Sequence, residues 1–188
     1  VVNHTGNVKI NAQSRDQEAF GVYVHSAKPN KESGTDQGGA ANFSKELNIK
    51  AVSANSNATG IFVSGAPITD ENGEVLFTSG QASVNTSGDT TIVAAGKTAS
   101  YALNAEADGQ ITVGSTGKTV HLTGDIVAKN DGVINIAGKT NTINGIVKAV
   151  DGGTVNLSGA SDAIYNNINI NSFVTQGTGS NGSVKLNG

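Results

Sequence analysis

The feature that most constrains the fold of this chain is an internal repeat. Residues 119–138 align with residues 140–159 at an offset of 21, with six identities in 20 positions. Four further pairs keep their apolar character: Leu122/Ile143, Ile126/Val147, Ile134/Val155 and Ile136/Leu157. A period of about 20 residues, built of short strands and glycines, is typical of a solenoid whose units stack. It therefore favours a protein with a long exposed surface over a closed globule.

Apolar residues recur in three columns along the chain. In the clearest column polar and apolar positions alternate, so that each strand places its apolar side chains on one face. This column contains Ile111/Val113, Ile134/Ile136, Val155/Leu157 and Val184/Leu186. The second contains Leu103/Ala105, Ile126/Ala128 and Val147/Ala149, and the third contains Val120/Leu122 and Ile143. Three short strands and three turns account for one coil of about 20–21 residues.

The sequence thus predicts an all-β fold, a right-handed parallel β-helix with coils stacked about 4.8 Å apart. We expect the corner glycines of this β-helix to need a positive φ. They are Gly109, Gly124, Gly132, Gly138, Gly145, Gly153 and Gly159.

Composition restricts the classes of protein and partner. Aromatic residues are 4% and charged residues 14% of the chain, so its stability must come from many thin layers. There is no Cys, which excludes disulfides and thiolate metal sites. A net charge of −3 without a cluster of Lys or Arg argues against a nucleic-acid partner. No apolar run reaches the roughly 18–20 residues of a membrane helix, so we expect no membrane insertion by this segment.

The N-terminal half repeats through a different phrase. Residues 8–24 align with residues 47–63 at an offset of 39. The excess over one coil predicts a protruding loop at about residues 27–45. A second excursion at about residues 66–80 contains Asn72-Gly73 and predicts a β-hairpin. Residues 161–170 fit a further coil with an asparagine-rich corner.

We expect residues 1–188 to form a single β-helix segment. Because the chain begins at Val1 and contains no Met, we expect a processed product or an excised fragment of a longer protein.

Three phrases of the sequence point to a family: INAQSRDQEAFGVYV, IKAVSANSNATGIFV and GGTVNLSG. They resemble the passenger domains of bacterial monomeric (type V) autotransporters. The resemblance implies a right-handed β-helical passenger at the cell surface of a Gram-negative bacterium or in the extracellular space. It also implies a role in adhesion to host or other bacterial cells, self-association, biofilm formation or virulence. The implied partner is a host surface protein, a glycan or another copy of the chain.

Candidate binding residues lie mainly on the two excursions, because loops on a rigid scaffold can vary without disturbing it. The first excursion offers Lys31, Glu32, Asp36 and Phe43, and the second offers an acidic tip of Asp70, Glu71 and Glu74. Either excursion could equally be a solvated insertion. Asn135 and Asn156 occupy equivalent positions, and their stacked amides could either stabilise the solenoid or bind another molecule.

Some carboxylates and histidines are candidates for metal binding or catalysis. Asp108, Asp131 and Asp151 fall near one corner of successive coils, where they are turn residues, calcium ligands or catalytic groups. Turn chemistry is favoured, since Asp and Asn beside Gly are typical of turns. The three histidines (His4, His25 and His121) lack metal-ligand spacing. We therefore expect no metal and no cofactor.

Two other functions compete with adhesion. A polysaccharide-degrading β-helix enzyme requires carboxylates, basic residues and aromatic rings on adjacent coils, and the low aromatic content predicts that no such aromatic platform exists. The chain also has no GxSxG motif and no credible Ser, His and Asp set, so we expect no enzymatic activity. The other alternative is a passive stalk that spaces a distal binding domain.

Overall fold

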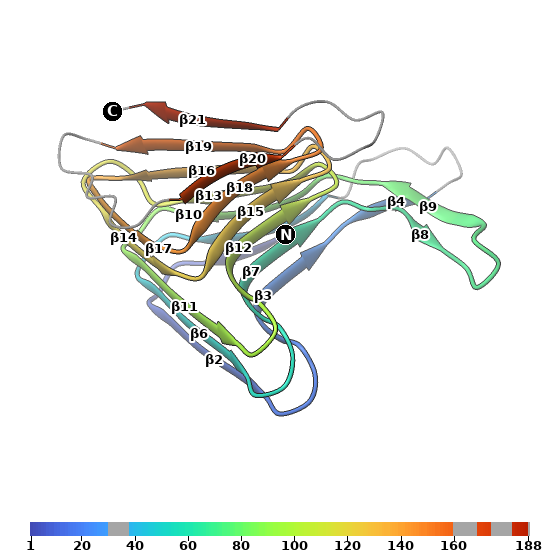
Figure 1. The fold of residues 1–188 in the computed structure, drawn as a ribbon, viewed down its shortest axis with the longest axis horizontal. Coiled ribbons are helices and arrows are strands. Elements are labelled where there is room, and N and C mark those ends of the chain that lie inside the picture. The colour runs from blue at the N-terminus through green and yellow to red at the C-terminus, as the bar shows by residue number, and fades with distance from the viewer. Residues whose placement is uncertain (30–37, 160–168, 174–181, 188) are drawn as a thin grey trace.

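All regular secondary structure in the described residues is β-strand. The structure is a computed structural model, and it describes residues 1–29, 38–159, 169–173 and 182–187. Strands stack into three parallel sheets, named A, B and C, and a small antiparallel sheet projects from the stack (Figure 1). The described part of the chain holds no helix that could cross a membrane.

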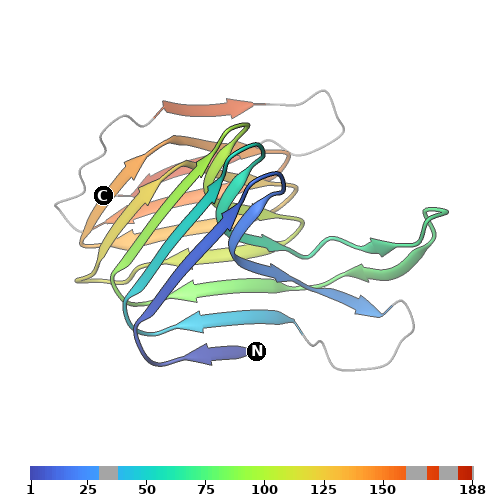
Figure 2. The same cartoon turned by 90° about the horizontal axis from the view of Figure 1, so that it is seen from below.

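The three parallel sheets form the walls of a solenoid. Sheet A contains, in spatial order, β1 (Val2–His4), β5 (Gly39–Phe43), β10 (Ala82–Thr86), β13 (Gly109–Val113), β16 (Val133–Gly138), β19 (Thr154–Gly159) and β21 (Ser183–Asn187). Sheet B contains β2 (Val8–Ser14), β6 (Leu47–Ser53), β11 (Thr90–Gly96), β14 (Thr119–Thr123) and β17 (Thr140–Asn144). Sheet C contains β3 (Ala19–His25), β7 (Ala58–Ser64), β12 (Ser100–Glu106), β15 (Asp125–Lys129), β18 (Ile146–Val150) and β20 (Asn169–Phe173). Each coil passes through sheets B, C and A in turn, and the coils lie side by side (Figure 2).

In both sequence repeats, the residues that align with each other lie side by side on paired strands of adjacent coils. Thr119 lies beside Thr140, and β14, β15 and β16 pair in parallel with β17, β18 and β19. In the first half, Ile10 lies beside Ile49 and β3 pairs with β7 in the register of the second alignment. The expected parallel β-helix is therefore confirmed.

The first coils are longer than the coil length that the sequence predicts. Ile10 and Ile49 are neighbours in adjacent coils, although nearly two of the predicted coil lengths separate them along the chain. The predicted protruding loop is narrower than residues 27–45, because Ala27–Pro29 forms β4 and Gly39–Phe43 forms β5 within sheet A. Residues 30–37 lie outside the described residues, as do residues 160–168, which cover most of the coil predicted at residues 161–170.

Aliphatic side chains fill the interior in columns along the solenoid axis. Ile111, Ile134 and Val155 of sheet A are fully buried, one beside the next. Each such side chain stabilises the fold by about 1.5–3 kcal/mol relative to an exposed one. Asn141 interrupts the column of sheet B: it is fully buried beside Val120, and its Oδ1 accepts no hydrogen bond from any described residue.

The corner glycines are needed for a different reason than expected. Gly124 has the expected positive φ, +120°, but Gly132 and Gly153 do not. A Cβ at Gly132 would overlap the carbonyl oxygen of Ala105 in the preceding coil, and one at Gly153 would overlap that of Ala128. These two glycines therefore permit the close approach of successive coils. Positive φ is found instead at non-glycine turn residues: Ala107, Asp108, Asn130, Asp131 and Asp151.

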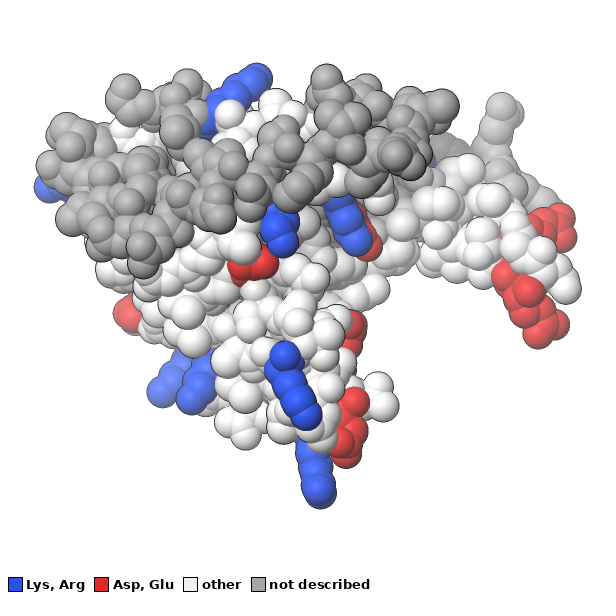
Figure 3. All heavy atoms as spheres, viewed as in Figure 1, with Lys and Arg blue, Asp and Glu red and all other residues white. Residues whose placement is uncertain are grey.

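The first three coils extend beyond the later ones as a thin wing (Figure 1). In this wing sheets B and C approach each other closely, and the residues between them are small. Buried Ala51, Ala58 and Ala94 form a separate core cluster there, with Ala12 packed against it. Where the wing joins the wider body, the outer face of sheet C borders a hollow in the molecular surface (Figure 3).

An arm projects sideways from the solenoid (Figures 1 and 2). It contains β4 (Ala27–Pro29), β9 (Val75–Ser79) and β8 (Ile68–Thr69), which pair in antiparallel order. Strands β8 and β9 lie within the hairpin that the sequence predicts at residues 66–80. The pairing of β4 with β9 joins the first excursion to the second, which the sequence did not indicate.

Candidate functional site

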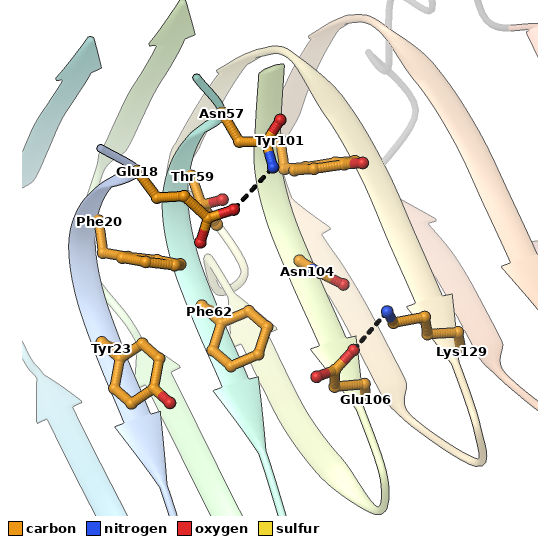
Figure 4. Close-up of a pocket in the computed structure, with 10 residues that line it drawn as sticks. All are labelled: Glu18, Phe20, Tyr23, Asn57, Thr59, Phe62, Tyr101, Asn104, Glu106 and Lys129. Carbon is orange, nitrogen blue, oxygen red and sulfur yellow. Dashed lines mark hydrogen bonds and ion pairs between the residues drawn. The ribbon is translucent and has the colours of Figure 1, made fainter. Parts of the chain in front are cut away.

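A groove lies on the outer face of sheet C, across strands β3, β7, β12 and β15 (Figure 4). It encloses about 360 Å³, which is within the range of small-molecule sites. Its aromatic lining residues are Phe20, Tyr23, Phe62 and Tyr101. Its polar lining residues are Glu18, Asn57, Thr59, Asn104, Glu106 and Lys129. The groove thus combines an apolar surface with a few polar groups, as ligand sites do.

The rings meet because successive coils place them in register. Tyr23 of β3 lies beside Phe62 of β7, and the ring centroids are 5.1 Å apart with an angle of 17° between the planes. Phe20 contacts both rings edge-on, at 5.2 Å from Tyr23 and 5.7 Å from Phe62. Each such pair contributes about 0.5–1.5 kcal/mol beyond the area it buries. The rings are therefore held in place before any ligand arrives.

Part of this aromatic surface is open to solvent. The ring-bearing residue Tyr23 is 55% exposed. In Figure 4 Tyr23 and Phe62 adjoin and are seen face-on, whereas Phe20 and Tyr101 are seen edge-on. The two rings are stacked with an offset, at 5.1 Å between centroids, so the part of their faces that stays uncovered forms the apolar platform on rigid strands.

Two polar pairs border the rings. Asn57 Nδ2 donates a hydrogen bond of 2.7 Å to Glu18 Oε1, just before β7 and β3 begin. Lys129 Nζ lies 2.6 Å from Glu106 Oε2, at the ends of β15 and β12. Two carboxylates and one ammonium group give the groove a net negative formal charge. The groove therefore favours neutral ligands over anionic ones.

Asn104 lies in the groove, and its amide oxygen is buried without a hydrogen-bond partner among the described residues. The residue is only 9% exposed, and its Oδ1 accepts no hydrogen bond from any described residue. An unsatisfied buried acceptor costs about 1–3 kcal/mol. The residues at the same outward position in the adjacent coils are Phe62 and Val127, so apolar side chains fit this column. The fold alone therefore does not require an amide at position 104.

The prediction that the chain has no aromatic platform is wrong. The sequence has three Tyr and five Phe, and four of these residues gather in the groove. A signal was present, because the alignment of residues 8–24 with residues 47–63 places Tyr23 opposite Phe62. No repeated phrase marks Tyr101, which lies beside Thr59 in the register of β12 with β7. The low aromatic content of the whole chain thus gave no indication that half of its aromatic residues lie together in one groove.

The asparagine column on the outer face of sheet A forms the expected amide ladder. Asn156 Nδ2 donates to Asn135 Oδ1 at 2.8 Å. In the same sheet, Asn42 donates to Asn3 at 2.8 Å and Asn85 to Asn42 at 2.9 Å. Each of these bonds links one coil to the next, which supports the stabilising role. A role of Asn135 and Asn156 in binding stays a prediction.

The acidic tip of the arm is organised around Asp70. The Asp70 Oδ1 accepts hydrogen bonds from the backbone N–H groups of Asn72, at 2.9 Å, and Glu74, at 2.8 Å. The bond from Glu74 is the main cause that lowers the pKa of the Asp70 carboxyl. Glu71 and Glu74 have exposed side chains. The Asp70 carboxylate is thus used by the turn itself, and Glu71 and Glu74 remain the outward acidic groups of the tip.

We expect the turn at the arm tip to loosen in acid. Because the folded pKa of Asp70 is below its unfolded value, about 3.9, its contribution is complete above that value and is lost as pH falls through the lowered pKa. Hydrogen exchange of the Asn72 and Glu74 amides, followed by NMR, should accelerate over that range. In Asp70→Asn, which keeps the Oδ1 acceptor, exchange corrected for its intrinsic pH dependence should not change there. An equal acid response in both proteins would contradict the assignment.

The candidate residues of the first excursion have different outcomes. Lys31, Glu32 and Asp36 lie outside the described residues. Phe43 lies in β5, is 9% exposed and belongs to the main hydrophobic core. Its position contradicts the expected role in binding, because its side chain faces the interior of the solenoid.

The corner carboxylates are part of a ladder of turns. The Asp108 N–H donates to the Asn130 carbonyl at 3.3 Å, and the Asp131 N–H donates to the Asp151 carbonyl at 3.1 Å. All three Asp residues have positive φ, a conformation in which Asp and Asn are enriched. The described ranges contain no group of three or more His, Cys, Asp or Glu that could hold a metal ion. Turn chemistry is the interpretation that the backbone geometry supports.

Comparison with known proteins adds no relative from which a function could be transferred. No family model, curated protein or solved structure matches the chain significantly. The structure itself defines the class as a parallel β-helix with a projecting arm and an aromatic groove. Function is therefore inferred from the geometry of this chain.

Proposed function

We propose that this chain is part of a bacterial autotransporter passenger and acts as an adhesin at the cell surface of a Gram-negative bacterium. The parallel β-helix is the fold that the resemblance to these passengers implies. The observation that carries the adhesive role is the groove, in which exposed ring surface lies on rigid strands. Its proposed partner is a host surface protein or glycan, or another copy of the chain.

The position of the groove suits adhesion. Its residues lie on or beside four adjacent strands, so little conformational entropy is lost when a ligand binds. A single groove of about 360 Å³ offers few contacts and therefore weak binding. Many copies on one cell would engage many ligands at once, and multivalency would raise the overall affinity by about 10²–10⁴.

The test compares beads that carry the chain with uncoated beads for attachment to host and bacterial cells. The groove variant Tyr23→Ala/Phe62→Ala should reduce attachment to the uncoated level, because it removes the platform. The arm variant Glu71→Ala/Glu74→Ala tests the other candidate surface, and it should attach like the original chain because the groove is unchanged in it. Circular dichroism would establish that both variants remain folded.

Three outcomes distinguish the proposal from its alternatives. Equal attachment of coated and uncoated beads would contradict adhesion and favour a passive stalk. Attachment lost only in the arm variant would move the binding surface to the acidic tip. Clumping of coated beads with each other, without attachment to cells, would identify another copy of the chain as the partner.

A polysaccharide-degrading enzyme is the second candidate. It is favoured by one observation, the presence of Glu18 and Glu106, two coils apart, in a groove lined by aromatic rings. Glu18 is hydrogen-bonded to Asn57, and Glu106 is paired with Lys129. Release of reducing ends from a polysaccharide, abolished in Glu106→Gln, would support this candidate over adhesion.

A further inference from the structure

We infer that the groove on sheet C binds a neutral glycan, with Asn104 as the residue that recognises a sugar hydroxyl. This inference rests on the proposed function, because it names the ligand class of the same groove. It starts from the buried amide of Asn104, whose Oδ1 has no hydrogen-bond donor among the described residues. A ligand hydroxyl is the kind of donor that this oxygen lacks.

The aromatic platform fits the other face of a sugar. A pyranose ring has an apolar face of C–H groups and an edge of hydroxyls. The C–H hydrogens are attracted to the negative face of an aromatic ring. Tyr23 and Phe62 are stacked with ring centroids 5.1 Å apart and 17° between their planes, and Tyr23, which is 55% exposed, offers the open ring surface for this contact. The platform and the adjacent amide thus match the two surfaces of a sugar.

Asn104 adjoins the platform along the solenoid axis. It lies beside Phe62 in the register of β12 with β7. Its Oδ1 is covered in the structure, so contact with a ligand requires a rotation about χ2, which is a soft torsion for Asn. A hydroxyl that meets the rotated amide would satisfy the orphan acceptor. A ligand without that hydroxyl would leave the Asn104 Oδ1 unpaired and would therefore bind more weakly than a ligand that has it.

Other ligand classes fit the groove less well. An extended peptide binds by pairing with a free sheet edge, but β7 and β12 are paired on both sides within sheet C. An anionic polymer, such as one of uronic acids or nucleotides, would meet Glu18 and Glu106 with only Lys129 in compensation. A neutral sugar avoids that repulsion, and the volume of about 360 Å³ suits a short segment of glycan.

The experiment titrates the chain with neutral oligosaccharides of glucose, mannose, galactose and N-acetylglucosamine, and with oligogalacturonate as the anionic probe. Binding is followed by tyrosine fluorescence, because the chain has no Trp and two of its three Tyr residues line the groove. Saturation-transfer NMR reports the sugar protons in contact. We expect saturable binding of at least one neutral probe and none of oligogalacturonate.

The variants Asn104→Leu and Asn141→Leu form a matched pair. Both remove a buried amide with an unpaired Oδ1, but only Asn104 lines the groove. Asn104→Leu should raise the midpoint of thermal unfolding, since an unsatisfied polar group is replaced by an apolar one. Asn141→Leu also loses the hydrogen bond that its Nδ2 donates to the Ser158 carbonyl at 3.3 Å, so its midpoint should rise less. Only Asn104→Leu should weaken sugar binding, by about tenfold or more. Binding lost from a protein that became more stable cannot be attributed to unfolding.

Several results would overturn the glycan assignment. These are no binding of any neutral probe, equal binding of oligogalacturonate, or undiminished binding by Asn104→Leu. Bead attachment that survives periodate oxidation of the target-cell glycans, together with no sugar binding, would overturn the glycan ligand and leave adhesion intact. Sugar binding without bead attachment would support the glycan ligand and contradict the adhesin proposal.

Discussion

Replacing Gly132 with valine is expected to lower the free energy of unfolding by about 3 kcal/mol or more. A Cβ at this position would overlap the carbonyl oxygen of Ala105 and would lie 2.6 Å from its carbonyl carbon. These atoms are backbone of the preceding coil, so they cannot move without opening the stack. The same close approach occurs at Gly153, which faces the Ala128 carbonyl one coil later. Urea unfolding followed by circular dichroism measures the effect.

Gly6→Val is the matched control for this substitution. The nearest atom to a Cβ at Gly6 is Nε2 of the His4 side chain at 3.4 Å, and the residue is exposed. We expect its free energy of unfolding to stay within about 0.5 kcal/mol of the original. If Gly132→Val unfolded at the same urea concentration as Gly6→Val, the close stacking of the coil corners would be wrong.

The stacking of coils could be predicted because it leaves a direct trace in the sequence. Each inward position repeats its apolar character in the next coil, as at Ile134 and Val155. The repeat of residue types stays recognisable when a coil is longer, so Ile10 and Ile49 align although they lie 39 positions apart along the chain. Register in a parallel solenoid is therefore visible wherever neighbouring coils keep the same residue types.

Other features escaped prediction because they depend on distances rather than on residue type. The sequence pattern places Phe43 in a protruding loop, since the polar residues before it hide the short strand β5. Of the seven glycines expected to have a positive φ at the corners, only Gly124 has one, so the predicted reason for glycine was wrong at the others, Gly132 among them. Close approach of two backbones and a turn with positive φ both select glycine, and the sequence cannot separate them.

The groove has one part that the sequence predicts and another part that it does not. The stacking of Tyr23 on Phe62 follows from a register that the sequence contains. The contribution of Tyr101 and Asn104 depends on β12 lying beside β7, and no repeated phrase marks that pairing. An amide at position 104 is also ordinary as a sequence feature. Only its burial and its unpaired oxygen make it a candidate for recognition.

Deleting residues 119–139 is expected to leave a folded β-helix that is one coil shorter. Thr140 would take the place of Thr119, because β17, β18 and β19 repeat the register of β14, β15 and β16. Ile111 would then stack on Val155 instead of Ile134, and both are fully buried aliphatic residues. At about 0.05–0.15 kcal/mol per residue, the loss of stability should be about 1–3 kcal/mol.

Deleting only residues 119–128 should instead abolish cooperative folding. The polar corner that follows would move into the core, with Asn130 at the buried position of Val120 and Gly132 at that of Leu122. Both positions belong to the aliphatic interior of sheet B, so the shortened chain would bury polar groups and lose packing. Circular dichroism and urea unfolding of the two deletions measure the contrast. If the larger deletion were the more damaging, interchangeable coils could not be the basis of this fold.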